Sequence, residues 1–108
     1  MGMTFSEMQK MYRNIVGRFN QIEQRDWQAA GAMIELTKQV GELAKQVMLK
    51  EQYYAFQSDE NVDEKLGNEM ADVIAQVMRL ADYYGIDLEA AFIEAREDED
   101  RYLKSRHV

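Results

Sequence analysis

The chain has 108 residues and a formal net charge of −7, with neither Pro nor Cys. This length fits one domain, so we expect a single domain over residues 1–108, and the missing Cys excludes disulfides and thiolate metal sites. The negative charge disfavours binding to nucleic-acid polymers or to membranes, and without an apolar run that spans a bilayer the expected location is cytoplasmic.

The pattern of polar and apolar residues predicts an all-α fold, which the absence of Pro favours. Thr4 with Glu7 forms a capping-box pattern, and the apolar residues that follow predict a first helix over residues 5–24. A second helix is expected to end near Lys50 or Glu51. Its predicted buried side consists of Ala30, Met33, Thr37, Val40, Ala44, Val47 and Met48.

The second half of the chain predicts two further helices. Asn61 with Glu64 is another capping-box pattern, and Gly85 suits the left-handed conformation beyond a helix end, so a third helix is expected between them. Asp87 can cap a fourth helix, in which the run Glu97-Asp98-Glu99-Asp100 should face solvent. Because amphipathic helical chains this short commonly gain stability by association, we expect a bundle that oligomerisation completes.

Acidic residues recur on the second and third predicted helices. Glu69 and Asp72 are three residues apart, so their carboxylates leave one helix face about a turn apart. Glu35, Gln39 and Glu42 form a stripe on the preceding helix, and antiparallel packing would bring Glu42 toward Glu69 and Asp72. Such oxygen atoms suit magnesium, although a solvent-facing surface is the commoner reason for a Glu-x-x-Asp pair.

An ordered set of motifs makes the functional interpretation more specific. The set comprises Arg25-Asp26-Trp27, Val40-Gly41-Glu42-Leu43-Ala44, Glu69-Met70-Ala71-Asp72-Val73 and Leu80-Ala81-Asp82-Tyr83-Tyr84-Gly85-Ile86-Asp87-Leu88. With these motifs, most of the chain resembles the MazG-like, all-α nucleoside triphosphate pyrophosphohydrolases. The resemblance implies a four-helix MazG-like bundle that assembles as a homodimer or a dimer of dimers, in which neighbouring subunits help to build each pocket.

The resemblance also implies a magnesium-dependent hydrolase, with Mn²⁺ as a possible replacement for Mg²⁺. Its substrate would be a nucleoside triphosphate, cleaved between the α- and β-phosphates to a nucleoside monophosphate and pyrophosphate. Glu42, Glu69 and Asp72 match three of the four acidic residues in the family's Glu-x-x-Glu and Glu-x-x-Asp pattern, and are the expected catalytic and metal-binding residues. Gln39 stands at the fourth position, where its amide oxygen can still bind a hard cation, and Lys38 precedes it.

The expected substrate-binding residues are Trp27, Arg96, Asp98 and Arg101. Trp27 can stack on a base, although a buried or interface aromatic is at least as good an interpretation. Arg101-Tyr102 matches a pair in the family's tail, upstream of which the family carries a Lys and an Asn. Here Glu94 takes the Lys position and Asp98 the Asn position, which leaves Arg96 as the candidate replacement for the missing cation.

Two other interpretations remain open. One is a catalytically weak or inactive relative that binds a nucleotide or serves as a helical interaction module, and the substitutions at Gln39, Lys38, Glu94 and Asp98 favour it. The other is a structural helical bundle with no affinity for magnesium or nucleotides. This last interpretation accounts poorly for the ordered motifs.

Overall fold

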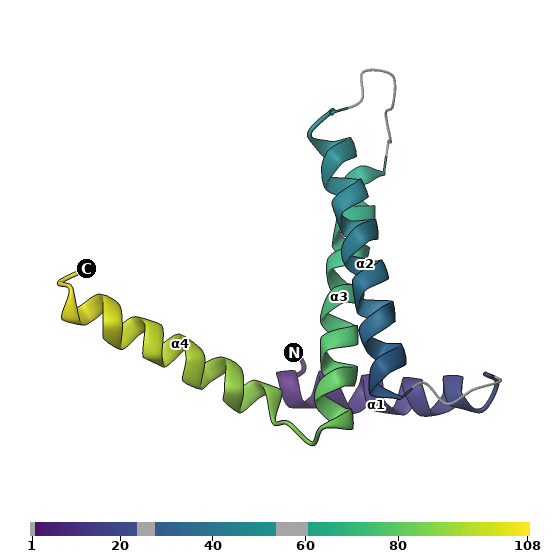
Figure 1. The fold of residues 1–108 in the computed structure, drawn as a ribbon, viewed down its shortest axis with the longest axis horizontal. Coiled ribbons are helices and arrows are strands. Elements are labelled where there is room, and N and C mark those ends of the chain that lie inside the picture. The colour runs from purple at the N-terminus through teal and green to yellow at the C-terminus, as the bar shows by residue number, and fades with distance from the viewer. Residues whose placement is uncertain (1, 24–27, 54–60) are drawn as a thin grey trace.

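The computed structural model describes residues 2–23, 28–53 and 61–108, and within these ranges it consists of four α-helices and no strands (Figure 1). The helices are α1 (Phe5–Asn20), α2 (Ala29–Lys50), α3 (Val62–Tyr83) and α4 (Leu88–Ser105). The all-α prediction is confirmed for the described part of the chain. None of these four helices combines the length and the apolar character that a membrane crossing requires.

Local hydrogen bonds explain most of the helix boundaries. Thr4 Oγ1 accepts a hydrogen bond from the Glu7 amide at 3.1 Å, and the Asp87 carboxylate accepts one from the Ala90 amide at 3.0 Å, so both predicted caps are confirmed. Asn61 occupies the N-cap position of α3, but its side chain makes no capping hydrogen bond, so the predicted capping box there is wrong. Gly85 adopts φ +64° beyond α3, as predicted.

The predicted end of the second helix is confirmed, whereas the predicted end of the first helix is wrong. The α2 helix ends at Lys50, as predicted. The α1 helix ends at Asn20 rather than at residue 24, because the Ile22 amide bonds back to the Phe19 carbonyl in a turn. The Glu23 amide also bonds to the Phe19 carbonyl, at 3.1 Å, so this carbonyl accepts two hydrogen bonds in the last turn.

The α2 and α3 helices lie side by side as an antiparallel hairpin (Figure 1). We call the end of the hairpin that holds Ala29 and Tyr83 its foot. The α1 helix crosses the foot and packs against α3, and α4 leaves from the foot and points away from the hairpin (Figure 1).

One register holds along the hairpin. Near the loop end, Lys50 Nζ pairs with Asp63 Oδ1 at 2.7 Å. Ala32 lies eighteen residues before Lys50, Ala81 lies eighteen residues after Asp63, and both alanines are buried, at 0% and 5% exposed. Because both helices rise equally per residue, the ion pair sets the pairing along the hairpin to within the reach of the Lys50 side chain, about one helical turn.

The predicted buried side of α2 is wrong for the single chain. Met33, Val40 and Val47 are 51%, 48% and 41% exposed. A neighbouring stripe is buried or half-buried instead, and it consists of Ala32, Leu36, Gln39, Leu43 and Gln46. The stripe that is buried lies one residue along α2 from the stripe that was predicted to be buried. The buried stripe is the more polar of the two, and α3 covers it.

The single chain does not close into a compact four-helix bundle. Its radius of gyration is 17.4 Å, whereas a compact chain of this length has a value of about 13 Å. The buried apolar residues of the described chain are Ala32, Met78 and Ala81, and α4 has no buried residue. Completion of the bundle by oligomerisation stays a prediction. The exposed apolar surface is large enough to take part in such a contact.

Replacing Gly85 by Ala should destabilise the protein, because a side chain at positive φ is strained. We expect a loss of about 1–2 kcal/mol in the free energy of unfolding, measured by urea denaturation. Gly17→Ala is the matched control, because nothing lies within 4 Å of the added methyl group and Gly17 lies inside α1. It should stabilise the protein by about 1 kcal/mol. Equal effects of both changes would contradict this account.

Candidate functional site

The hairpin places the predicted carboxylates of α2 and α3 at one level. Glu42 lies eight residues before Lys50, and Ala71 lies eight residues after Asp63. Since Ala71 lies between Glu69 and Asp72 in the sequence, Glu42 is level with both of these residues along the hairpin. The antiparallel packing that the sequence suggested is therefore present.

Although Glu42, Glu69 and Asp72 lie at one level along the hairpin, their carboxylates do not form one cluster. Glu42 and Asp72 are exposed, and Glu69 is half-buried. Among the described residues, no group of three or more His, Cys, Asp or Glu side chains is placed so that it could hold a metal ion. The predicted metal site therefore stays a prediction, and assembling it needs side-chain movement or oxygen atoms from outside the single chain.

The donor atoms nevertheless suit a hard divalent cation. Glu69 Oε2 is buried and accepts no hydrogen bond from the described residues. A buried carboxylate oxygen without a partner costs free energy, which a bound cation would offset. Gln39 Nε2 donates to Glu35 Oε1 at 3.2 Å, so the amide oxygen of Gln39 is the atom that remains for a ligand.

Lys38 has a partner on its own helix. Its Nζ lies 3.8 Å from Glu35 Oε1. Glu35 therefore contacts both of the residues that distinguish this chain from the acidic pattern, Lys38 and Gln39. This arrangement offsets part of the positive charge next to the predicted metal site, and it engages Glu35 elsewhere than at a metal.

The predicted substrate-binding residues of α4 lie on an exposed helix. Arg96 donates two hydrogen bonds to Glu99, at 3.1 and 2.8 Å, and its guanidinium lies 4.8 Å from the centre of the Phe92 ring. Arg101 pairs with Asp98. The run from Glu97 to Asp100 is exposed, as predicted. Trp27 lies outside the described residues.

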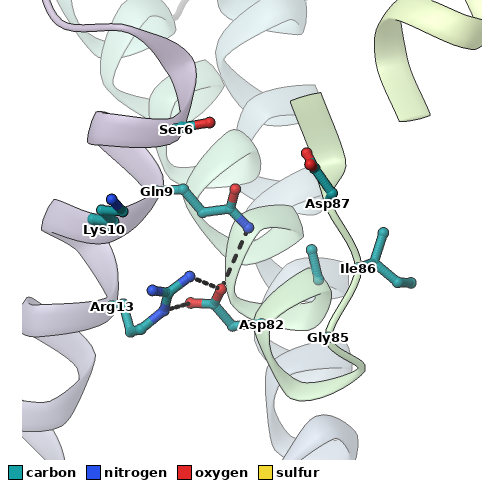
Figure 2. A pocket seen from close by; sticks show the side chains of 9 residues that line it. Ser6, Gln9, Lys10, Arg13, Asp82, Gly85, Ile86 and Asp87 are labelled. Atoms are coloured by element: carbon teal, nitrogen blue, oxygen red, sulfur yellow. Dashed lines mark hydrogen bonds and ion pairs between the residues drawn. The ribbon is translucent and has the colours of Figure 1, made fainter. Parts of the chain in front are cut away.

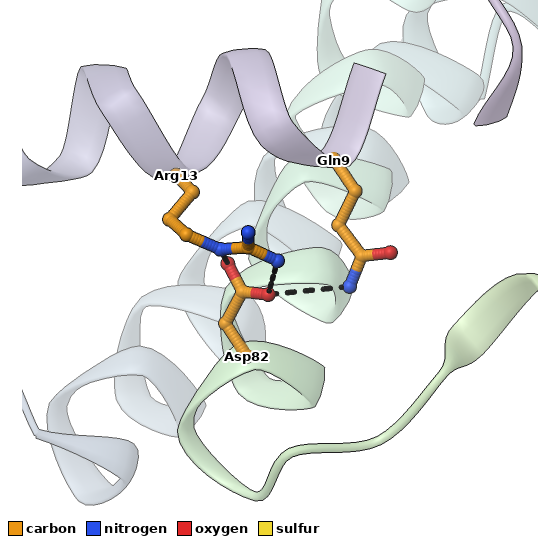
Figure 3. A network of polar contacts seen from close by, with 3 residues as sticks. All are labelled: Gln9, Arg13 and Asp82. Atoms are coloured by element: carbon orange, nitrogen blue, oxygen red, sulfur yellow. Dashed lines mark hydrogen bonds and ion pairs between the residues drawn. The ribbon is translucent and has the colours of Figure 1, made fainter. Parts of the chain in front are cut away.

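The motif that runs from Leu80 to Leu88 forms the joint between α3, α1 and α4. Asp82 accepts two hydrogen bonds from Arg13, at 3.0 and 2.7 Å, and a third from the amide of Gln9 at 3.3 Å (Figure 3). This contact raises the pKa of Arg13 above its ordinary value, through the hydrogen bonds and then the charge of Asp82. No local pattern pointed to Gln9 or Arg13, because 69 residues separate Arg13 from Asp82.

A hollow of about 370 Å³ lies at this joint (Figure 2). Figure 2 shows Arg13 and Gln9 both directed at Asp82, with Lys10 beside them. None of the side chains that line the hollow has a buried polar atom without a hydrogen-bond partner. Because Gln9, Arg13 and Asp82 bond to one another, we interpret the hollow as the surroundings of a structural joint.

A smaller hollow, of about 180 Å³, lies among residues of α1, α2 and α3. It is lined by Tyr12, Phe19, Glu23, Glu35, Gln76 and Arg79. Gln76 Nε2 donates to the Tyr12 hydroxyl at 3.0 Å, and Gln76 Oε1 is buried without a partner among the described residues. Burial raises the pKa of Tyr12 above 10.0, against a smaller opposite effect of the Arg79 charge. Sequence analysis did not identify this hollow.

Comparison with known proteins does not assign the chain to a family. No protein-family model matches it, and no curated protein is significantly similar to it. The MazG-like interpretation therefore depends on the motifs themselves and on the chemistry of the residues that the hairpin places at one level.

The pKa of Glu99 tests the ion pairing on α4. The hydrogen bonds from Arg96, and then its charge, lower this pKa below 4.5. A lowered pKa means that the pair stabilises α4 above pH 4.5 and that this contribution is lost as the pH falls through the lowered value. In a carboxyl NMR titration, Arg96→Ala should return the pKa of Glu99 toward 4.5. Lys104→Ala should leave it unchanged, since Lys104 pairs with Asp100, and equal titrations of Glu99 in both variants would contradict the assignment.

Proposed function

We propose that this chain is a magnesium-dependent, MazG-like nucleoside triphosphate pyrophosphohydrolase, which releases a nucleoside monophosphate and pyrophosphate. The observation that carries the proposal is the level placement of Glu42 with Glu69 and Asp72 on two packed helices. The unpartnered, buried oxygen of Glu69 supports it further, because such an atom calls for a cation or a donor.

In this proposal Glu42, Glu69 and Asp72 hold the metal with the help of the Gln39 amide oxygen. Magnesium, when bound, screens the charge of the triphosphate and lowers the pKa of a bound water molecule, and manganese can serve in its place. One of the three carboxylates accepts a proton from the water that attacks the α-phosphorus. Arg96 and Arg101 bind phosphate oxygens, for which their guanidinium groups are suited.

We also propose that the functional form is a homodimer or a dimer of dimers. The hairpin exposes a row of apolar side chains with seven-residue spacing on α2, namely Met33, Val40 and Val47. Met70 and Ile74 of α3 are also half-exposed, at 50% each. We call these five residues the outer stripe. A second copy of the same surface is its proposed occupant, because seven-residue apolar spacing suits helix-to-helix packing.

A second candidate function is a non-catalytic module that binds nucleotides or partner helices. The hydrogen bond between Gln39 and Glu35 favours it, since it draws a residue of the predicted metal site toward a neighbour on its own helix. The pairing of Arg96 and Arg101 with acids of α4 also favours it, because these contacts compete with phosphate. Binding of nucleoside triphosphates without hydrolysis would distinguish this module from the enzyme.

Activity should depend on Asp72 and not on an acid elsewhere on the same helix. The protein is incubated with Mg²⁺ and a panel of ribo- and deoxynucleoside triphosphates, and the products are separated by ion-exchange chromatography. We expect monophosphate and pyrophosphate, and a fall in kcat of roughly 100-fold or more for Asp72→Ala. Glu64→Ala is the control, because Glu64 is an exposed acid in the first turn of α3. Absence of pyrophosphate across the panel would refute the proposal.

A charge in the outer stripe should dissociate the assembly. Val40 lies in the middle of the stripe, so Val40→Glu would bury a carboxylate at the proposed interface, which is unfavourable. We expect the mass measured by light scattering after gel filtration to fall to that of a single chain. Lys45→Glu is the control, because it adds a carboxylate to an exposed position of α2 outside the stripe. A monomeric wild type, or an unchanged mass for Val40→Glu, would contradict the proposed interface.

A further inference from the structure

The smaller hollow, among α1, α2 and α3, is lined by two residues that each carry a buried oxygen atom without a hydrogen-bond partner. Gln76 is only 7% exposed, and its Oε1 accepts no hydrogen bond from the described residues. Oε2 of Glu23, which follows α1, is also buried and has no described partner. Leaving such acceptors unpaired is unfavourable, so the smaller hollow suits a ligand that donates hydrogen bonds.

The charges around the smaller hollow disfavour phosphate groups inside it. Glu23 and Glu35 contribute two carboxylates to its lining, and Arg79 contributes one guanidinium, which leaves a net charge of −1. This balance repels an anion. The volume of about 180 Å³ is several times the roughly 30 Å³ that one water molecule occupies, so a neutral ring can enter.

The smaller hollow lies one helical turn from predicted metal-binding residues, toward the foot of the hairpin. Gln76 follows Asp72 by four residues on α3, and Glu35 precedes Gln39 by four residues on α2. Residues at this spacing are neighbours on one helix face, about 6 Å apart along the axis. Burial raises the pKa of Tyr12, and the nearby charges of Asp72 and Glu35 add to this effect. A nucleotide with its phosphates at the carboxylates can therefore place its base in the smaller hollow.

Two further groups suit the lining to a nucleobase. The Tyr12 hydroxyl accepts a hydrogen bond from Gln76 Nε2 at 3.0 Å, so its own proton can be donated to a ligand. Phe19 is 52% exposed and offers a ring on which a base can stack. Adenine and cytosine present an amino donor beside a ring-nitrogen acceptor, whereas uracil and hypoxanthine carry a carbonyl oxygen in place of the amino group.

We infer that the smaller hollow binds the base of the nucleotide and selects adenine and cytosine, whose amino group donates to Gln76 and Glu23. A carbonyl oxygen at the same position of the base would face two acceptors and be repelled. This inference rests on the proposed function, and it adds the class of substrate. Gln76 and Glu23 are then the residues that determine specificity.

Two pairs of substrates that differ in this one group test the inference. Cytidine and uridine triphosphates differ at position 4 of the base, and adenosine and inosine triphosphates differ at position 6. With wild-type protein and Mg²⁺, we expect kcat/KM to be roughly 10-fold or more higher for the amino-bearing member of each pair. Equal kcat/KM values within both pairs would overturn the inference.

Two variants test whether the named acceptors cause the preference. Gln76→Met removes one acceptor at similar side-chain length, and Glu23→Gln replaces a carboxylate oxygen by an amide nitrogen that can donate to a carbonyl. Each should lower the ratio of kcat/KM between cytidine and uridine triphosphates by roughly 5-fold or more.

Gln46→Met is the matched control, because Gln46 is also 7% exposed with an unpartnered Oε1 but does not line the smaller hollow. It should leave the ratio unchanged. An unchanged ratio in both folded variants of the hollow, or an equal fall in the control, would overturn the assignment.

Binding of monophosphates separates this inference from the proposed hydrolase. Cytidine and uridine monophosphates are titrated, with Mg²⁺ present, into isotope-labelled protein and followed by NMR. We expect tighter binding of the cytidine nucleotide and a shift of the Gln76 side-chain amide signal. Such binding without release of pyrophosphate from any triphosphate would refute the hydrolase and support the selective hollow. Binding of neither nucleotide, or shifts that spare Gln76, would overturn the hollow as the base site.

Discussion

Packing of α2 against α3 sets the position of every residue that the functional argument uses. Ala32 of α2 and Ala81 of α3 are both buried, and the ion pair between Lys50 and Asp63 joins the two helices near the loop end. A shift of one residue in this pairing would change which carboxylates are level with one another. The common level of Glu42, Glu69 and Asp72 is thus a consequence of helix packing, and the chemistry proposed for them depends on it.

The seam between these helices is more polar than stability alone requires. Gln46 and Gln76 are each 7% exposed, and the Oε1 atom of each is buried without a partner among the described residues, as is Oε2 of Glu69. A buried acceptor left without a hydrogen bond typically costs about 1–3 kcal/mol. Departures from stable packing concentrate at functional sites, which agrees with a seam that provides oxygen atoms for ligands.

Apolar side chains are exposed outside the seam, and they too indicate contact with another molecule. The outer stripe faces away from the seam, and α4 extends from the foot without burying a side chain. A chain this short gains little from its own core, so further burial has to come from another molecule. The interface that we propose at the outer stripe places a second copy of the chain where this surface is exposed.

Short-range features were predictable from the sequence. The caps at Thr4 and Asp87 and the turn at Gly85 each depend on residues within one helical turn, and the structure contains all three. The all-α fold followed from apolar spacing, whereas antiparallel packing of the two acidic helices was an arrangement that the spacing permitted. These interactions form wherever the local sequence allows, so no distant partner is needed to predict them.

Tertiary structure alone decided which face of α2 is buried and where α4 points. The stripes through Ala32 and Val40 have similar spacing, and only the position of α3 distinguishes them. The bond between Arg13 and Asp82 joins residues that are distant in the sequence and holds α1 against α3. By itself the sequence therefore determined the helices and the candidate carboxylates, whereas long-range packing, which local spacing does not encode, determined how these residues lie relative to one another.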